Sequence, residues 1–216
     1  MNLKTVISLL LILLGTVAQA QEQDIEKIEI DVSAQANLYF KEVRDTSLVP
    51  GGAGIPPIVI DIRGVKMISF EGAEGLVTCF GERENTMFGP DGGAYGEHTD
   101  VHELGAISGI KHKSKVMFLC GVILSDFSSL DPPFPAKDYT DKEDYEELYP
   151  SFNQPFFIGD GKNKDGTIQR IQVREDATTM YIGFADCLAG PPRNYSNNEG
   201  NIKITVVLYR SGMGRN

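Results

Sequence analysis

The sequence predicts an all-β protein built as an antiparallel β-sandwich, and three observations support this prediction. Short apolar runs recur along the chain with turn-forming residues between them, a pattern typical of sandwiches. Two of these runs, 178–185 and 202–209, show the period of two expected for a half-buried strand. No window beyond the N-terminal segment has a long helical period, which argues against a doubly wound α/β fold.

The expected strands follow one another from residue 38 to residue 209, after a short acidic leader. Twenty-three glycines and eleven prolines in the chain supply the turns between them. In the strand at 178–185, Met180, Ile182 and Phe184 lie on one face. The last strand likewise places its alternating apolar residues on one of its own faces: Ile202, Ile204, Val206 and Leu208. The apolar runs lie at 38–40, 58–62, 65–70, 76–80, 116–124, 156–158, 168–173, 178–185 and 202–209.

The N-terminal residues 1–20 have the features of a secretory signal peptide. Lys4 precedes an apolar run at 6–14, and Ala18-Gln19-Ala20 forms a small-x-small cleavage site. The run is too short for a comfortable membrane span. The sequence therefore predicts an exported protein, periplasmic or extracellular and without membrane insertion, whose residues 21–216 form a single β-sandwich domain.

The charge of the mature chain limits its partners. Removing residues 1–20 takes one lysine from the 20 basic residues and none of the 30 acidic ones, which leaves a formal charge of −11. Such a surface is a poor partner for nucleic acid or an anionic membrane. It suits divalent cations and neutral ligands, although solubility alone explains it equally well. The sequence leaves open whether the protein is a homo-oligomer.

One segment, at about 125–154, interrupts the strand pattern. Its prolines at 132–135 and its dense acids at 138–147 disfavour a central strand. We expect a long acidic, Pro-rich insertion at the surface, with one short helical turn near Asp144. A solvated acidic loop is a better explanation of its carboxylates than a cation site.

Three cysteines remain after processing. An oxidising compartment would permit one disulfide among Cys79, Cys120 and Cys187, and the pairing is open. Cys79 and Cys120 lie in apolar strand-like segments, so we expect them to be buried or paired. Cys187 directly follows Asp186, whose carboxylate disfavours a thiolate, so it is not expected to be a nucleophile.

Catalytic motifs are not found. No serine lies in a Gly-x-Ser-x-Gly context, and no phosphate-binding glycine loop with a lysine is present. His98 and His102 are four residues apart, as in a helical zinc site, but the turn-rich segment 88–96 before them argues against a helix. A ligand-contacting loop is the better interpretation. His112 lies between two lysines and is expected at the surface. We predict that the protein is not an enzyme.

Oxygen-bearing side chains gather near the C-terminus, between two strand-like segments. Asp186 ends one strand, and the run 194–200 contains Asn194, Asn197 and Asn198 before the next. Calcium takes six to eight oxygen ligands and tolerates irregular loops, so this combination suits a calcium ion. A polar hairpin turn without metal is the alternative, because the same residues form turns for unrelated reasons.

The order of several motifs resembles that of the galactophilic, calcium-dependent PA-IL-like bacterial lectins. The resemblance covers roughly residues 30–210 apart from the acidic insertion. The matching segments are 64–70, Cys79-Phe80-Gly81, 88–92, 104–110, Phe157-Ile158-Gly159, 177–186 and 194–202. It implies a jelly-roll-like sandwich, similar to galactose-binding domains, with one calcium at the end of the sheets.

In that family, side chains matching Asp186, Asn197 and Asn198 hold the ion. Backbone carbonyls matching Phe80 and Asn194 complete the protein ligands, and two sugar hydroxyls complete the shell. The resemblance therefore implies Ca²⁺ as the cofactor and a carbohydrate, galactose-like or another glycan, as the partner. It implies the following sugar-binding residues: His98, Asp100, Asp186, Cys187, Asn194 and Asn197.

The chain departs from the family pattern in four places. His98 matches the family's sugar-contacting histidine only when one extra residue is allowed between Phe88 and His98. Phe80 stands where the family has tyrosine, which a carbonyl ligand tolerates. Val101 stands where the family has a sugar-binding glutamine. Seven residues separate Asp186 from Asn194, where the lectin has three. These differences leave the calcium site in place and the identity of the sugar open.

The sequence thus predicts an exported calcium-dependent carbohydrate-binding module. The alternative is a structural calcium site in a protein–protein interaction module of the envelope or extracellular space, whose contact surface is the insertion between Pro132 and Tyr149. A third hypothesis is an enzyme that uses carboxylates or a zinc ion at His98 and His102.

Overall fold

The structure, a computed structural model, describes residues 24–79, 86–94, 98–128, 132–186 and 188–210. Within these ranges the protein is built of strands and short 3₁₀ turns, with no α-helix. The 3₁₀ turns are η1 (Phe40–Glu42), η2 (Thr46–Leu48) and η4 (Tyr195–Asn197). The strands are β1 (Asp24–Ser33), β2 (Ile58–Asp61), β3 (Val65–Thr78), β4 (Asp91–Gly93), β5 (Thr99–Val101), β6 (Ile110–His112), β7 (Val116–Leu124), β8 (Lys137–Asp138), β9 (Glu147–Leu148), β10 (Phe156–Phe157), β11 (Arg170–Gln172), β12 (Thr179–Ala185), β13 (Leu188–Gly190) and β14 (Glu199–Arg210).

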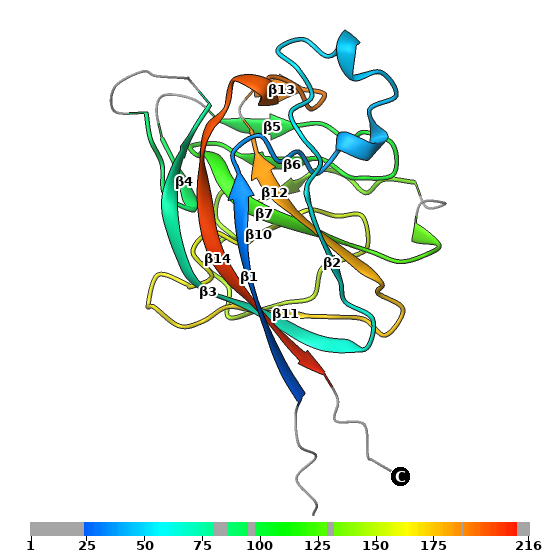
Figure 1. Ribbon diagram of the computed structural model, residues 1–216, viewed down its shortest axis with the longest axis vertical. Coiled ribbons are helices and arrows are strands. Elements are labelled where there is room, and N and C mark those ends of the chain that lie inside the picture. The colour runs from blue at the N-terminus through cyan, green and yellow to red at the C-terminus, as the bar shows by residue number, and fades with distance from the viewer. Residues whose placement is uncertain (1–23, 80–85, 95–97, 129–131, 187, 211–216) are drawn as a thin grey trace, which may run out of the picture.

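Three sheets make up the fold (Figure 1). The first has the order β1-β14-β3-β11-β9, and the second has the order β10-β7-β12-β2, with β4 beside β7. A smaller third sheet has the order β13-β5-β6-β8. The long ladders are antiparallel, whereas three pairings between strands of two or three residues are parallel. The predicted all-β sandwich is confirmed; the jelly-roll connection stays a prediction.

The core lies between the first and second sheets. Met180, Ile182 and Phe184 of β12 are fully buried, as the alternation predicts. Ile202 and Val206 of β14 are buried in the same cluster from the opposite sheet. Strand β7 is apolar along nearly its whole length because it lies inside its sheet and is covered on both faces.

Two expectations about local structure are wrong. The acidic leader contains β1, which pairs along its full length with β14, its apolar residues alternating with charged ones. The apolar run at 38–40 is not a strand but leads into η1. There Leu38 and Tyr39 are buried, and the Tyr39 hydroxyl donates to the Ser108 carbonyl at 2.8 Å.

The segment at 125–154 takes part in the fold rather than lying only on its surface. It supplies β8 and β9, each at the edge of a sheet, where proline and charge are tolerated. Tyr139 is 2% exposed, and the Tyr145 hydroxyl donates to the Phe157 carbonyl. The expected helical turn near Asp144 is wrong, because the chain there forms turns and bends.

Three buried side chains, those of Cys79, Cys120 and His112, test the predictions about cysteine pairing and about the position of His112. Cys79 and Cys120 are both buried and free, so they do not pair with each other; Cys187 lies outside the described residues. His112 is 2% exposed, and its expected surface position is wrong. No helix within the described residues is long and apolar enough to cross a membrane.

Candidate functional site

The candidate site lies where β12 ends and β14 begins. Asp186 follows the last residue of β12 and is 1% exposed. Asn198 immediately precedes β14 and is also 1% exposed. The Asn198 side-chain amide donates from Nδ2 to Asp186 Oδ2 at 3.3 Å. The structure thus brings together two of the predicted calcium-ligating side chains, which are twelve positions apart in the sequence.

The orientation of the Asn198 amide is fixed by two acceptors. Its Nδ2 donates to the Ala34 carbonyl at 3.1 Å as well as to Asp186. Both acceptors are oxygen atoms, so only the nitrogen of the amide can face them. Oδ1 is consequently directed elsewhere, and it is buried without a hydrogen-bond partner among the described residues. A buried amide oxygen with no donor is a destabilising feature that a cation would relieve.

Asn197 and Asn194 lie at the two ends of η4, which joins the site to neighbouring loops. Asn197 is exposed, and its Nδ2 donates to the Cys79 carbonyl at 3.3 Å. Asn194 has left-handed backbone angles, φ 66° and ψ 17°. Between them Tyr195 is fully buried, with its hydroxyl donating to the Phe184 carbonyl at 3.0 Å. Tyr195 therefore holds η4 against the end of β12.

Two predicted site residues fall outside the described residues. These are Phe80, whose carbonyl the resemblance assigns to the ion, and Cys187, which it assigns to the sugar. The described residue before Phe80 is Cys79, whose carbonyl accepts the bond from Asn197.

The predicted sugar-contacting segment lies beside the same end of the sandwich. Thr99 of β5 pairs with Leu188 of β13, two positions after Asp186. In Figure 1, β5 and β13 lie together at the upper end, next to the blue segment that carries η1 and η2. Residues 99–101 form a strand here, so the expectation of a loop is wrong for this part.

His98 and Asp100 differ in how free their side chains are to contact a ligand. His98 is exposed just before β5. Asp100 already has a cationic neighbour, since Lys111 Nζ lies 2.8 Å from its Oδ1. His102 Nε2 lies 3.9 Å from Asp100 Oδ2, and the side chain of His102 is half exposed. Within the described ranges, no group of three or more His, Cys, Asp or Glu side chains is placed to hold a metal ion.

Sequence reasoning missed the residues that position η4 from the other side. Gln35 donates from Nε2 to the carbonyls of Ser196 and Asn198, at 3.1 and 3.2 Å. The Asn194 amide donates to the Pro50 carbonyl, and the Ser196 amide to the Gly51 carbonyl. A Cβ on Gly51, where φ is +70°, would lie 2.0 Å from Asn194 Oδ1. The Gly51-Gly52 pair is a visible signal of this close approach; nothing in the sequence marks Gln35.

A second polar cluster surrounds His112 of β6, which pairs with Thr99 of β5. The Ser114 amide donates to His112 Nδ1 at 3.2 Å, so Nε2 of the neutral ring carries the hydrogen and donates to Glu143 Oε2 at 3.2 Å. Lys115 Nζ lies 2.7 Å from the same carboxylate oxygen. Burial lowers the pKa of His112, although Glu143 acts against this shift. The cluster ties the 125–154 segment to β6.

Comparisons with known proteins assign neither a family nor a function to the chain. No family model matches the chain, and neither a curated protein nor a solved structure matches it.

Proposed function

We propose that this protein is an exported module that binds carbohydrate through a calcium ion held beside Asp186 and Asn198. The observation that carries the proposal is the buried Asn198 Oδ1. Within the part of the chain that the structure describes it has no hydrogen-bond partner, although the nitrogen of the same amide donates to Asp186. A carboxylate and an amide oxygen at one point are the ligand types that calcium prefers.

The protein groups have distinct roles in this proposal. Asp186 supplies negative charge, and Asn197 and Asn198 supply amide oxygens. The carbonyls of Phe80 and Asn194 supply the remaining protein ligands. Bound calcium would supply positive charge and coordination positions that sugar hydroxyls can occupy.

Two features of the site favour a polyhydroxylated ligand. Asn197 is exposed beside the buried Asp186–Asn198 pair, so the site reaches the surface. His98 is exposed before β5, whose neighbour β13 follows Asp186 almost directly. Imidazole and amide groups both donate and accept hydrogen bonds, as recognition of hydroxyl groups requires.

Thermal unfolding in excess EDTA and in millimolar calcium tests the site. Calcium at 100 times its dissociation constant would stabilise the protein by about 2.7 kcal/mol. For a domain of this size that raises the melting temperature by roughly 5–10 °C. Asp186→Asn should lose this shift, whereas Asp176→Asn, which changes an exposed carboxylate paired with Arg174, should keep it. An equal calcium response in both variants would contradict the assignment.

A second candidate function keeps the calcium as a structural ion in a protein–protein interaction module. The observation that favours it is the exposure of large aromatic side chains in the 125–154 segment. Phe127 is 76% exposed, Tyr149 is 73% exposed and Phe134 is 45% exposed. Exposed aromatics are common anchors of interfaces. A glycan array that stays blank in calcium, together with a partner lost on Tyr149→Ser, would support this candidate over the first.

A further inference from the structure

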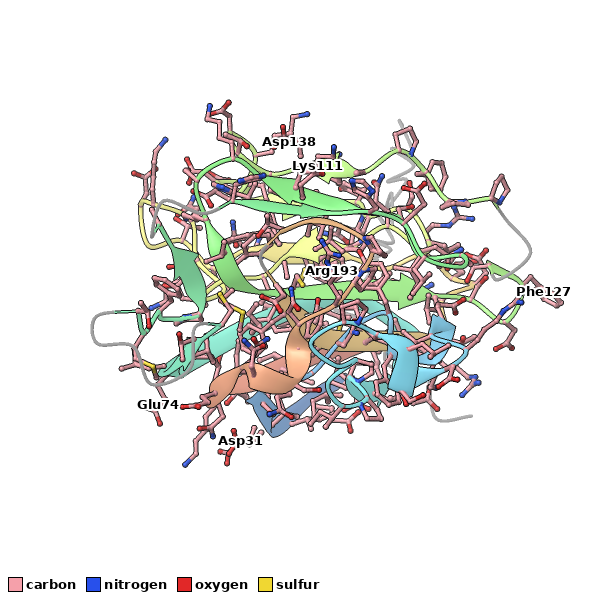
Figure 2. The ribbon with its side chains drawn as sticks, turned by 90° about the horizontal axis from the view of Figure 1, so that it is seen from above. Asp31, Glu74, Lys111, Phe127, Asp138 and Arg193 are labelled. Atoms are coloured by element: carbon pink, nitrogen blue, oxygen red, sulfur yellow. The ribbon has the colours of Figure 1, made fainter. Side chains whose placement is uncertain are left out.

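A cavity lies beside the candidate site, at the end of the molecule seen in Figure 2. It has a volume of about 610 Å³, which is within the usual range for small-molecule sites. Residues 42–45 and 48–50, from the last residue of η1 to just beyond the end of η2, form one wall. Residues 191–193 form another, and Leu104 and Gly105 close the space between them. In Figure 2, Arg193 marks this wall near the middle of the view.

The lining of the cavity is mainly apolar. Val43, Leu48, Val49 and Leu104 contribute aliphatic side chains, and three prolines add further apolar surface. The charged residues of the lining are Glu42, Arg44, Asp45 and Arg193, so the two signs balance.

Of the two acidic side chains in the lining, Asp45 makes local hydrogen bonds and Glu42 packs over a glycine. Asp45 Oδ1 accepts from the amide and the hydroxyl of Ser47, at 3.0 and 2.6 Å. The Glu42 carboxylate lies directly over Gly105, because a Cβ there would be 1.7 Å from Glu42 Oε2. With balanced charge and apolar walls, the cavity favours an uncharged apolar group over an ion.

Two lining residues of the cavity, Arg193 and Pro50, adjoin Asn194, whose carbonyl is a proposed calcium ligand. Arg193 directly precedes Asn194, and the Asn194 amide donates to the Pro50 carbonyl at 3.1 Å. On the other side, the His102 amide donates to the Gly190 carbonyl at 2.8 Å, just before the prolines of the wall. The rings of Pro191 and Pro192 fix the φ angle of each residue, which limits the ordering needed when a ligand enters. The wall at 191–193 belongs to the longer connection between Asp186 and Asn194.

We propose that this cavity is a second subsite, which binds an apolar alkyl group carried by the glycan at the calcium site. The glycan part of this inference rests on the proposed function. The cavity and its preference for apolar groups do not depend on that function. The ligand class is therefore an amphipathic glycoside, with hydroxyl groups toward Asp186 and Asn198 and an alkyl group between Leu48 and Pro192.

The neutral fluorescent probe N-phenyl-1-naphthylamine tests the cavity without any sugar. We expect saturable binding to the mature protein, residues 21–216, equal in calcium and EDTA and unchanged in Asp186→Asn. Leu48→Asp should weaken it at least tenfold, because it places a charge in the apolar wall. Leu48 is 76% exposed, so the change should not unfold the protein. Leu76→Asp is the matched control, since Leu76 is 53% exposed on β3 and lies outside the lining. Non-saturable binding, or equal loss in both variants, would overturn the subsite.

Titration with octyl and methyl β-glycosides of galactose, glucose and mannose in calcium tests the link to the glycan. For at least one sugar we expect the octyl compound to bind at least tenfold more tightly, and this advantage should disappear in Leu48→Asp but not in Leu76→Asp. Equal affinities of the octyl and methyl compounds would overturn the proposed link. Saturable probe binding without any glycoside binding would overturn the glycan part alone and leave the cavity as an apolar site.

Discussion

Replacing Asn198 by aspartate tests the site most directly, because it alters charge with almost no change in shape. Asn198→Asp removes the two hydrogen bonds donated by Nδ2, to Ala34 and to Asp186. It also places a second carboxylate in the position now 3.3 Å from Asp186 Oδ2. Without calcium, the variant should therefore be less stable than the native protein.

The magnitude follows from these contacts. A neutral hydrogen bond contributes about 1 kcal/mol and one to a charged group about 1.5–3 kcal/mol, so the lost bonds cost about 3 kcal/mol. Two buried like charges add a further penalty, limited by protonation of one of them. A total of about 3–5 kcal/mol corresponds to a fall in melting temperature of roughly 6–20 °C in EDTA.

Calcium should reverse part of this loss. The added carboxylate increases the negative charge of the site, which strengthens the binding of a divalent cation. We therefore expect the difference in melting temperature between calcium and EDTA to be larger in Asn198→Asp than in the native protein. Differential scanning fluorimetry across a calcium titration measures both effects.

Asn201→Asp provides the matched control. Asn201 also donates from its amide to a carboxylate, that of Asp31, but this pair is exposed. Solvent screens the like charges there, so the change should cost at most about 1 kcal/mol and leave the calcium response unaltered. The reasoning is refuted if Asn198→Asp is as stable as Asn201→Asp in EDTA, or if its calcium response does not exceed that of the native protein.

Three further predictions concern the surroundings of the site and the His112 cluster. Gly51→Ala should lower the free energy of unfolding by about 1–3 kcal/mol, because Gly51 has a left-handed backbone and a Cβ there would clash with Asn194. Gly72 has a similar φ, but a Cβ there would meet no neighbouring atom, so Gly72→Ala should cost less. Urea unfolding measures both variants. Tyr195→Phe should cost about 1–3 kcal/mol, because it leaves a buried carbonyl without its donor, and should reduce calcium affinity in a titration. Burial lowers the pKa of His112, so the unfolded chain binds the proton more readily than the folded protein does. The contribution of His112 to stability should therefore be complete above about pH 6.5 and fall as the pH drops below that value. His112→Gln should flatten this dependence in melting curves recorded across the pH range.

The strands were predictable where the residue pattern is local and strong. The alternation in β12 and β14 and the apolar run of β7 predict both the element and its buried face. Strand β1 has the same alternation, with Ile28, Ile30 and Val32 directed inward between charged residues. The acidic residues between these positions, Glu29 and Asp31, make the segment resemble a solvated leader, which hides the alternation.

Other elements depend on partners that sequence patterns do not reveal. Strands of two or three residues, such as β8 and β9, carry too few positions to show a period. They form because neighbouring strands offer free edges. His112 has lysines on both sides, which suggest solvent, yet the Glu143 carboxylate from the 125–154 segment covers its ring edge.

The sequence by itself determined the all-β class, the core faces of the long strands and the oxygen-rich residues proposed for the site. These properties follow from residue type and short-range period, which each segment carries alone. Only the tertiary structure decided that Asp186 meets Asn198, that Gln35 and Gly51 support η4, and that residues 42–50 and 191–193 enclose a cavity. Such contacts join residues far apart in the chain, and their positions are set by strand register and loop packing.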